Sequence, residues 1–242
     1  MVSEIQVETS RVGLVVRPPE PTEPAILYLH GDRYLSGSPE SALDMAGHLS
    51  LRTGSTVVCA RYRSVFPTAL IDVQSAYHYT QAMGPVALVG EGTGAALAAS
   101  LLVRLRDAES ALPRCATLVS GLFDLTLQAP SLLFNAGANP TFDLDGLRAE
   151  VQRYAAGTPL TDPFVSPLHA NFHGLPPVQL LTAGTDPFLD DSLAFAARAA
   201  HSSVSVDLRV HPDATTLHTE TLPAMSAFIR SHAPADRTDL SA

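Results

Sequence analysis

The sequence predicts an α/β fold with a mostly parallel central sheet and helices on both of its faces. Short apolar runs of strand length alternate along the chain with longer segments of helical character. The apolar runs are continuous, which is typical of strands that are covered on both faces. The chain has 242 residues, of which 46% are hydrophobic and 16% charged, so it can bury a sizeable core. We therefore expect residues 1–242 to form one domain.

Local signals predict each element in turn. Strands are expected in eight apolar runs, the first two as an antiparallel lead-in: Ile5–Thr9, Val12–Arg17, Ala25–His30, Thr56–Tyr62, Pro85–Gly90, Cys115–Gly121, Val178–Gly184 and Ser205–His211. Two helices are expected to open at a proline, which fits the first helical position. The expected helices are Pro39–Leu51, Pro67–Met83, Thr93–Asp107, Asp145–Ala156, Phe188–His201 and Glu220–Ser231.

One connection is too long to be an ordinary loop. More than 50 residues separate the strands that end at Gly121 and begin at Val178. We expect this segment, at about residues 125–167, to form a small cap inserted over one face of the sheet. Its candidates for lining a pocket are Phe134, Asn135, Phe142 and Tyr154. Of these we assign Phe134 to substrate binding, together with Phe188 after the cap.

Charge and composition limit the partners that the chain can have. The net charge is −9 and the 15 basic residues are scattered, which disfavours nucleic acid and anionic membrane surfaces. We expect a small-molecule substrate or ligand, while a homodimer stays open. Cys59 and Cys115 lie in or beside apolar strands, as buried thiols of a reducing cytoplasm do. The N-terminus has no signal-peptide pattern, and no cofactor or metal site is expected.

The stretch VALVGEGTGAALAAS, residues 86–100, joins a buried strand to an alanine-rich helix through three glycines. Two known sequence motifs have this pattern. One is the dinucleotide-binding loop G-x-G-x-x-G/A, and the other is the hydrolase turn G-x-S-x-G with Gly92 in place of the serine. A dinucleotide loop normally follows the first strand, with an acidic residue at the end of the next strand. Here several strands precede the loop, and Asp107 and Glu109 follow a helix, so the context favours the hydrolase turn.

Three further motifs occur in the order that a hydrolase requires. They are LYLHGDRYLSGSPES at residues 27–41, LLTAGTDPFLDDS at 180–192 and LRVHPDATTLHTE at 208–220. With these motifs, the chain resembles the hormone-sensitive-lipase-like branch of the α/β-hydrolases, especially bacterial acetyl-ester hydrolases. The resemblance spans about residues 12–230 and implies an α/β-hydrolase fold. It also implies that Asp186 is the catalytic acid, and that backbone amides at Gly31, Asp32, Gly92 and Thr93 form the oxyanion hole.

The chain departs from the family pattern at the catalytic positions. Gly92 has no side chain that a base could activate. The position of the family histidine falls on Thr216 without gaps, and His218 takes the role only after a small shift. Asp32 and Arg33 replace glycines of the oxyanion loop, so we expect their side chains to act in the cleft.

Two more residues complete the predicted site. Tyr34 and Glu91 adjoin the two loops of the cleft, and we assign both to substrate binding. The catalytic side chains are then Asp32, Arg33, Asp186 and His218.

These departures favour an enzyme that keeps the fold but not ester hydrolysis. We expect a cyclase, dehydratase, isomerase or decarboxylase that acts on a carbonyl compound, in small-molecule biosynthesis, using oxyanion-type amides and acid–base side chains. One alternative is a ligand-binding protein without activity. Another is a residual carboxylic-ester hydrolase that uses water directly or the Thr93 hydroxyl.

Overall fold

An eight-stranded sheet forms the centre of the computed structural model, which describes residues 5–31, 37–139 and 142–233. Its strands are β1 (Gln6–Ser10), β2 (Gly13–Arg17), β3 (Thr22–Leu29), β4 (Ser55–Ala60), β5 (Val86–Glu91), β6 (Cys115–Val119), β7 (Val178–Ala183) and β8 (Val206–His211). They are ordered β1-β2-β4-β3-β5-β6-β7-β8. The β1–β2 and β2–β4 pairs are antiparallel, and all other pairs are parallel. The predicted mostly parallel α/β architecture is therefore confirmed.

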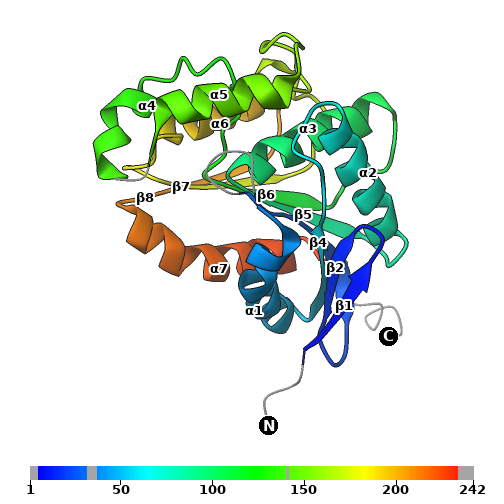
Figure 1. The fold of residues 1–242 in the computed structure, drawn as a ribbon. Coiled ribbons are helices and arrows are strands. Elements are labelled where there is room, and N and C mark those ends of the chain that lie inside the picture. Colours follow the sequence, from blue (N-terminus) through cyan, green and yellow to red (C-terminus); the bar gives the residue numbers. More distant parts are fainter. Residues whose placement is uncertain (1–4, 32–36, 140–141, 234–242) are drawn as a thin grey trace.

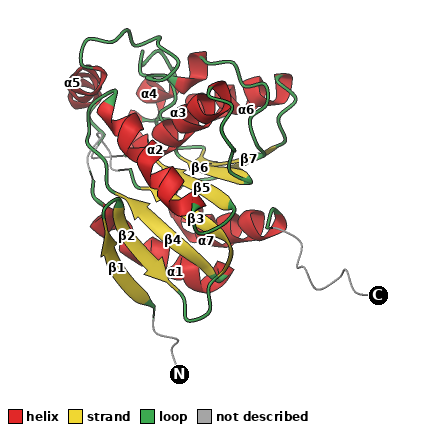
Figure 2. Cartoon of the chain, turned by 90° about the vertical axis from the view of Figure 1, so that its right-hand side faces the viewer, coloured by secondary structure: helices red, strands yellow, loops and turns green. Residues whose placement is uncertain are grey.

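Helices cover both faces of this sheet (Figure 1). One face carries α1 (Leu43–Thr53) and α7 (Ala214–Ser231), which pack on Ile26, Tyr28 and Val89. The other face carries α2 (Thr68–Gln81), α3 (Thr93–Asp107) and α6 (Leu189–His201). Figure 2 shows the same two layers from the side, with α2 and α3 on one side of the strands and α1 and α7 on the other. In the described part of the chain, no helix is long and apolar enough to cross a membrane.

The long connection between β6 and β7 lies over the α3 and α6 side of the sheet (Figure 1). It contains α4 (Ser131–Phe134) and α5 (Leu144–Ala155), with the short 3-10 helices η2 (Ala136–Ala138) and η3 (Pro167–His169). A further 3-10 helix, η1 (Pro39–Ala42), precedes α1. The apolar residues of α5, among them Leu147 and Val151, join the core cluster on this side of the sheet.

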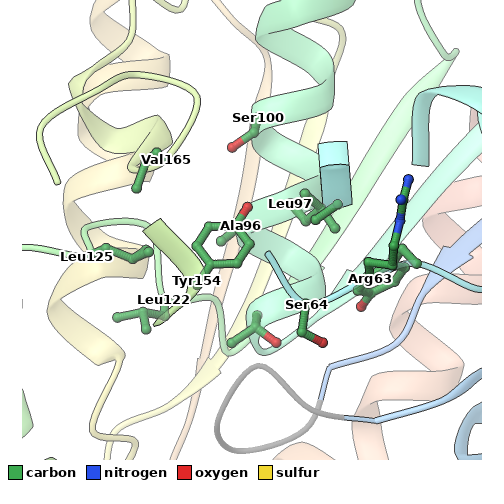
Figure 3. Close-up of a pocket in the computed structure, with 12 residues that line it drawn as sticks. Arg63, Ser64, Ala96, Leu97, Ser100, Leu122, Leu125, Tyr154 and Val165 are labelled. Atoms are coloured by element: carbon green, nitrogen blue, oxygen red, sulfur yellow. The ribbon is translucent and has the colours of Figure 1, made fainter. Parts of the chain in front are cut away.

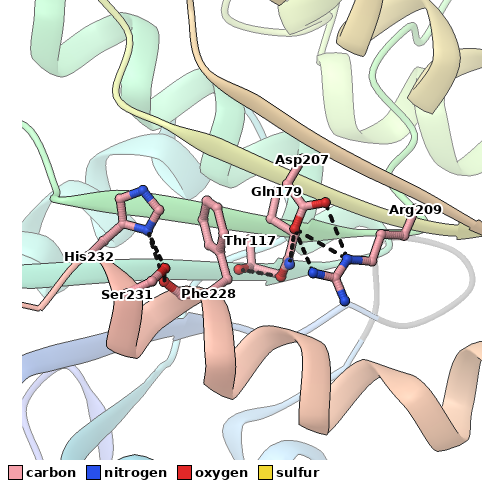
Figure 4. Close-up of polar contacts among 7 residues, drawn as sticks. All are labelled: Thr117, Gln179, Asp207, Arg209, Phe228, Ser231 and His232. Atoms are coloured by element: carbon pink, nitrogen blue, oxygen red, sulfur yellow. Dashed lines mark hydrogen bonds and ion pairs between the residues drawn. The ribbon is translucent and has the colours of Figure 1, made fainter.

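A row of polar side chains crosses the sheet on the side of α7 (Figure 4). Thr117, Gln179 and Asp207 are register partners on β6, β7 and β8. The Thr117 hydroxyl donates to Oε1 of Gln179 over 3.3 Å, and Nε2 of Gln179 donates to Oδ2 of Asp207 over 2.8 Å. Arg209 donates to the same carboxylate at the sheet edge. Because buried polar groups need hydrogen-bond partners, this row stabilises one register of the three strands.

Two element ends differ from the predicted ones in ways that shape the site. Helix α7 begins at Ala214 and not at Glu220, because the Asp213 side chain accepts the Thr216 amide over 2.8 Å and caps the helix there. His218 therefore lies in a helix and not in a loop. Strand β6 ends at Val119 and not at Gly121, because Ser120 has a φ of 47°. A left-handed residue cannot continue a strand.

Candidate functional site

A cavity of about 420 Å³ opens at the carboxyl edge of the sheet. Its wall includes Gly31, Gly92, Ser120, Asp186, Phe188 and Leu217. These residues lie in the segments that follow β3, β5, β6, β7 and β8, so five neighbouring parallel strands deliver them to one place. Ligand sites of α/β sheets form at this edge, where the strands end. The volume lies within the range of small-molecule pockets.

The turn at Gly92 joins β5 directly to α3. Gly92 has a φ of 54° and a ψ of −120°, a conformation that glycine adopts more readily than other residues. Its amide donates to the Val119 carbonyl over 2.8 Å, which ties the turn to the end of β6. The first amides of α3 have no carbonyl partner within the helix. The turn therefore presents the positive end of a 15-residue helix at the cavity.

The two glycines beside this turn have a packing role. A Cβ at Gly94 would overlap the carbonyl oxygens of Leu29 and His30, and one at Gly90 would lie 2.7 Å from Cα of Ala95. Helix α3 can therefore approach the ends of β3 and β5 only because these positions lack side chains. The glycine pattern that resembles a dinucleotide loop is explained by close helix–strand packing.

The segment after β3 is held against the same turn. A Cβ at Gly31 would overlap the carbonyl oxygen of Glu91, so the two backbones touch. The Tyr62 ring stacks on His30 with ring centroids 4.6 Å apart, and its hydroxyl donates to the His30 carbonyl. Gly31 thus lies in the cavity wall, and its role in an oxyanion hole stays a prediction. The predicted residues Asp32, Arg33 and Tyr34 lie outside the described residues.

Among the described residues of the cavity wall, Asp186 is the one with an acidic side chain. It follows β7, and its Oδ1 accepts the Phe188 amide over 2.9 Å. Burial raises the pKa of the Asp186 carboxyl, while hydrogen bonds from the Ser120 hydroxyl and the Phe188 amide act in the opposite direction. Nδ2 of Asn135 donates to the Asp186 carbonyl over 2.8 Å and holds this loop in place. The carboxylate is therefore firmly positioned and more basic than an exposed one.

Glu91 points to the other face of the sheet, among the residues that α7 covers. Tyr28 hydrogen-bonds to its carboxyl, and His218 is close enough to interact with it electrostatically. Burial raises the pKa of Glu91, and these two neighbours act in the opposite direction. The structure thus places His218 near Glu91. The side chain of His218 is exposed. The α7 residues that line the cavity are Ala214 and Leu217.

The remaining predicted side chains divide between the cavity and the surface. Phe188 lines the cavity together with Phe142, and their rings meet edge to face with centroids 6.1 Å apart. Phe134 is 85% exposed and is not part of the cavity wall.

Thr93 lines a second cavity, of about 20 Å³, on the far side of the turn. Figure 3 shows this small cavity with Tyr154, Ser100 and Leu122 around it. Thr93 is buried there, so its hydroxyl is not a wall group of the 420 Å³ cavity.

Sequence reasoning missed Ser120 and Asp191. Ser120 lies in the cavity wall next to Asp186, and its place after an apolar strand was a usable signal, since polar residues at that edge face ligands. Asp191 accepts the amides of Phe123 and Asp124 over 2.7 and 2.8 Å and so anchors the chain that leaves β6. No sequence pattern pairs these distant segments. Among the described residues, no group of three or more His, Cys, Asp or Glu could hold a metal ion.

The comparisons with known proteins agree on the family. The family described as alpha/beta hydrolase fold matches residues 26–218. An acetyl-hydrolase of Streptomyces hygroscopicus is 32% identical over 206 residues, which are 82% of this chain and 69% of that protein. An ethyl acetate hydrolase of Pseudomonas putida is 30% identical over 206 residues, 79% of this chain and 64% of that protein. The chain thus spans about two thirds of the length of these relatives.

A solved structure gives the same result. An esterase from the bacterial hormone-sensitive lipase (HSL) family superposes with a TM-score of 0.87 at 27% identity, and covers 94% of this chain and 84% of that one.

These names overturn the prediction of a non-hydrolytic cyclase, lyase or isomerase in biosynthesis. The relatives are named hydrolases, and the solved structure is an esterase, so the comparisons point to carboxylic-ester hydrolysis, the last of the three functions considered from the sequence. With the fold and these matches together, the chain belongs to the α/β-hydrolase family, in its hormone-sensitive-lipase-like branch.

Proposed function

We propose that the chain binds a short-chain carboxylic ester in the 420 Å³ cavity and hydrolyses it. The observation that carries this proposal is the shared wall of the cavity, where Asp186 and the helix turn at Gly92 face one space. The names of the relatives, acetyl-hydrolase and ethyl acetate hydrolase, support a small acyl group.

We further propose that Gly92 occupies the position of the nucleophilic serine in this family. The position between β5 and α3 and the positive φ of 54° support this assignment. A glycine cannot form an acyl intermediate, so the attacking oxygen comes from another group.

The lining of the cavity suits an uncharged ester. Phe142, Phe188 and Leu217 supply apolar surface for the acyl and alcohol chains. Asp186 introduces a negative charge once it has lost its proton, and this charge disfavours an anionic ligand in a partly desolvated site. The carboxylate product is repelled for the same reason, which favours its release.

The proposed catalysis uses two groups, the N-terminus of α3 and the Asp186 carboxylate. The first amides of α3, at Thr93 and Gly94, stabilise the negative charge that develops on the ester carbonyl oxygen. Asp186 takes the proton of the attacking oxygen, and its raised pKa makes it a better base than an ordinary carboxylate.

The test is steady-state hydrolysis of p-nitrophenyl acetate by the wild type, Asp186→Asn and Asp145→Asn. Asp145→Asn is the control, because it is the same substitution at an exposed position of α5, where Asp145 pairs with Arg148. We expect Asp186→Asn to lower kcat/KM by roughly 10²–10⁴-fold and Asp145→Asn to leave it unchanged. Turnover that is equal in all three proteins would contradict the proposal. Ester binding without turnover would instead identify a ligand-binding protein.

A further inference from the structure

We propose that Ser120 is the nucleophile of this site and that Asp186 is the base that removes its proton. The inference rests on the proposed ester hydrolysis and names the group that replaces the missing serine side chain at Gly92. Ser120 directly follows β6, and Gly92 directly follows the neighbouring strand β5.

The sheet register places Ser120 beside Gly92. Glu91 pairs with Val119 in the parallel β5–β6 ladder, and the Gly92 amide donates to the Val119 carbonyl. The next residue, Ser120, donates its own amide to the Leu181 carbonyl over 2.9 Å. Ser120 is thus fixed on both sides, between the turn at Gly92 and the strand that leads to Asp186.

The backbone of Ser120 turns its side chain out of the strand pattern. Thr117 and Val119 follow the strand and contact the groups on the side of α7. At Ser120 the φ of 47° breaks this alternation, and the residue becomes part of the cavity wall. A left-handed conformation is uncommon for residues other than glycine and is often found at functional sites.

The contact of Ser120 with Asp186 meets the requirement for an activated hydroxyl. The Ser120 hydroxyl lies near enough to the Asp186 carboxylate to lower the pKa of that carboxyl, and both residues line the same 420 Å³ cavity. A nucleophile with an adjacent base that is itself held in position is the general pattern of covalent catalysis. Here the Phe188 amide, 2.9 Å from Oδ1, and the Asn135 side chain hold the base.

Other hydroxyl groups near the turn do not meet this requirement. Thr93 and Ser100 line the separate 20 Å³ cavity (Figure 3). Thr182 also interacts with the Asp186 carboxylate, but it is fully buried in β7 and does not line the 420 Å³ cavity. Thr185 shares the wall of this cavity, but the hydroxyls that interact with the carboxylate are those of Ser120 and Thr182.

The first half of the reaction transfers the acyl group. Oγ of Ser120 bonds to the ester carbonyl carbon as its proton passes to Asp186, and the carbonyl electron pair moves onto oxygen beside the first amides of α3. Collapse of this intermediate breaks the bond to the alcohol oxygen, which leaves with the proton from Asp186.

The second half of the reaction regenerates the free Ser120 hydroxyl. Water attacks the acyl group on Ser120 and gives its proton to Asp186. The Ser120 oxygen then leaves and takes that proton back. One ester and one water give one carboxylic acid and one alcohol.

The experiment combines covalent labelling with turnover. The wild type, Ser120→Ala, Ser120→Cys, Asp186→Asn and the control Ser100→Ala are treated with a fluorophosphonate probe, and the adduct is located by peptide mass mapping. Hydrolysis of p-nitrophenyl acetate is measured on the same five preparations. Thermal unfolding of each shows whether the variant is folded.

We expect one adduct on the Ser120 peptide in the wild type and in Ser100→Ala. Ser120→Ala loses both the adduct and turnover, and Asp186→Asn labels more slowly by roughly 10²–10⁴-fold. Ser120→Cys, which keeps a nucleophilic atom at this place, is acylated by the ester on the cysteine. If Ser120→Ala is unfolded, the mapped position of the wild-type adduct and the Ser120→Cys acylation decide the result.

Two results would overturn the assignment, and they are distinguishable. Turnover that survives in folded Ser120→Ala, or an adduct on another residue, removes Ser120 as the nucleophile and leaves ester hydrolysis standing. No turnover and no adduct in any of the five proteins removes both this inference and the proposed function.

Discussion

The amide of Gly92 donates to the carbonyl of Val119 over 2.8 Å, and this bond sets the end of β5 against the end of β6. The residue after Val119, Ser120, therefore directly follows the residue that holds the turn at Gly92. In this chain that residue is a serine in contact with a buried acid. The candidate chemistry thus depends on two adjacent strand ends and not on the turn alone.

A serine placed at Gly92 is expected to give little activity. In Gly92→Ser the new hydroxyl faces a cavity whose described wall residues include no histidine; His218 is exposed, and the α7 residues in the wall are Ala214 and Leu217. Turnover of p-nitrophenyl acetate should match that of Gly92→Ala, which adds the same Cβ without the hydroxyl. Both variants place a side chain at a φ of 54° and should lose about 1–3 kcal/mol of unfolding free energy.

A different result for this pair would be informative. If Gly92→Ser exceeds Gly92→Ala by 10²-fold or more, the size of a general-base contribution, then His218 reaches the turn when a serine is present. The position of His218 on α7 would then need revision.

The rate of ester hydrolysis should depend on the protonation of Asp186. Burial raises the pKa of its carboxyl, and only the ionised form can act as a base. We expect kcat/KM to fall as pH decreases through a pKa above the ordinary value for aspartate. The measurement is a pH–rate profile of the wild type with p-nitrophenyl acetate. An acid limb at or below the ordinary pKa of aspartate, about 3.9, would contradict the role of a desolvated base.

Asp191 should make the protein more stable at low pH than at neutral pH. Burial raises the pKa of its carboxyl to about 7, although the amides of Asp124 and Phe123 act in the opposite direction. The unfolded value is about 3.9, so the folded state binds the proton more tightly. This contribution is fully present below pH 4 and is lost as pH rises through 7.

Urea unfolding of the wild type and Asp191→Asn between pH 4.5 and pH 8 measures this effect. Asparagine keeps an oxygen acceptor for the Phe123 and Asp124 amides but does not titrate. Each unit of pKa shift corresponds to about 1.4 kcal/mol. The unfolding free energy of Asp191→Asn should therefore decrease less with pH than that of the wild type. Parallel curves for the two proteins would show that Asp191 titrates normally.

Close packing of α3 on the strand ends should not tolerate a side chain at Gly94. In Gly94→Ala the new Cβ overlaps the carbonyl oxygens of Leu29 and His30, so either the helix or β3 has to move. We expect a loss of about 1–3 kcal/mol of unfolding free energy from this overpacking. Gly137→Ala is the control, since a Cβ there meets no atom within 4 Å. Equal unfolding free energies of the two variants would contradict the packing role of Gly94.

Much of the fold could be predicted from the sequence, because its signals are local. Continuous apolar runs mark the buried strands, and the limits of α3, Thr93–Asp107, agree with the predicted ones. Asp186 and Gly31 could be placed because each lies shortly after a strand, β7 ending at Ala183 and β3 ending at Leu29, whose end is clear in the sequence. Their convergence follows from the parallel topology.

The rest depends on contacts between distant segments. The start of α7 depends on the Asp213 cap, which outweighs the weak helix propensity of Thr215 and Thr216. The left-handed φ of Ser120 is a single-residue feature with no periodic signal. Gly92 in a turn of the G-x-S-x-G type therefore suggested a loss of hydrolysis, because the sequence does not place another hydroxyl beside Asp186.

Acetate release from ethyl acetate, followed by proton NMR, is the decisive measurement of ester hydrolysis by this chain. It detects the product of an unactivated ester, and it compares the wild type with Asp186→Asn under identical conditions. We predict that the wild type produces equal amounts of acetate and ethanol, and that Asp186→Asn does so more slowly by roughly 10²–10⁴-fold. No acetate above the protein-free control, from wild type that is folded, would contradict it.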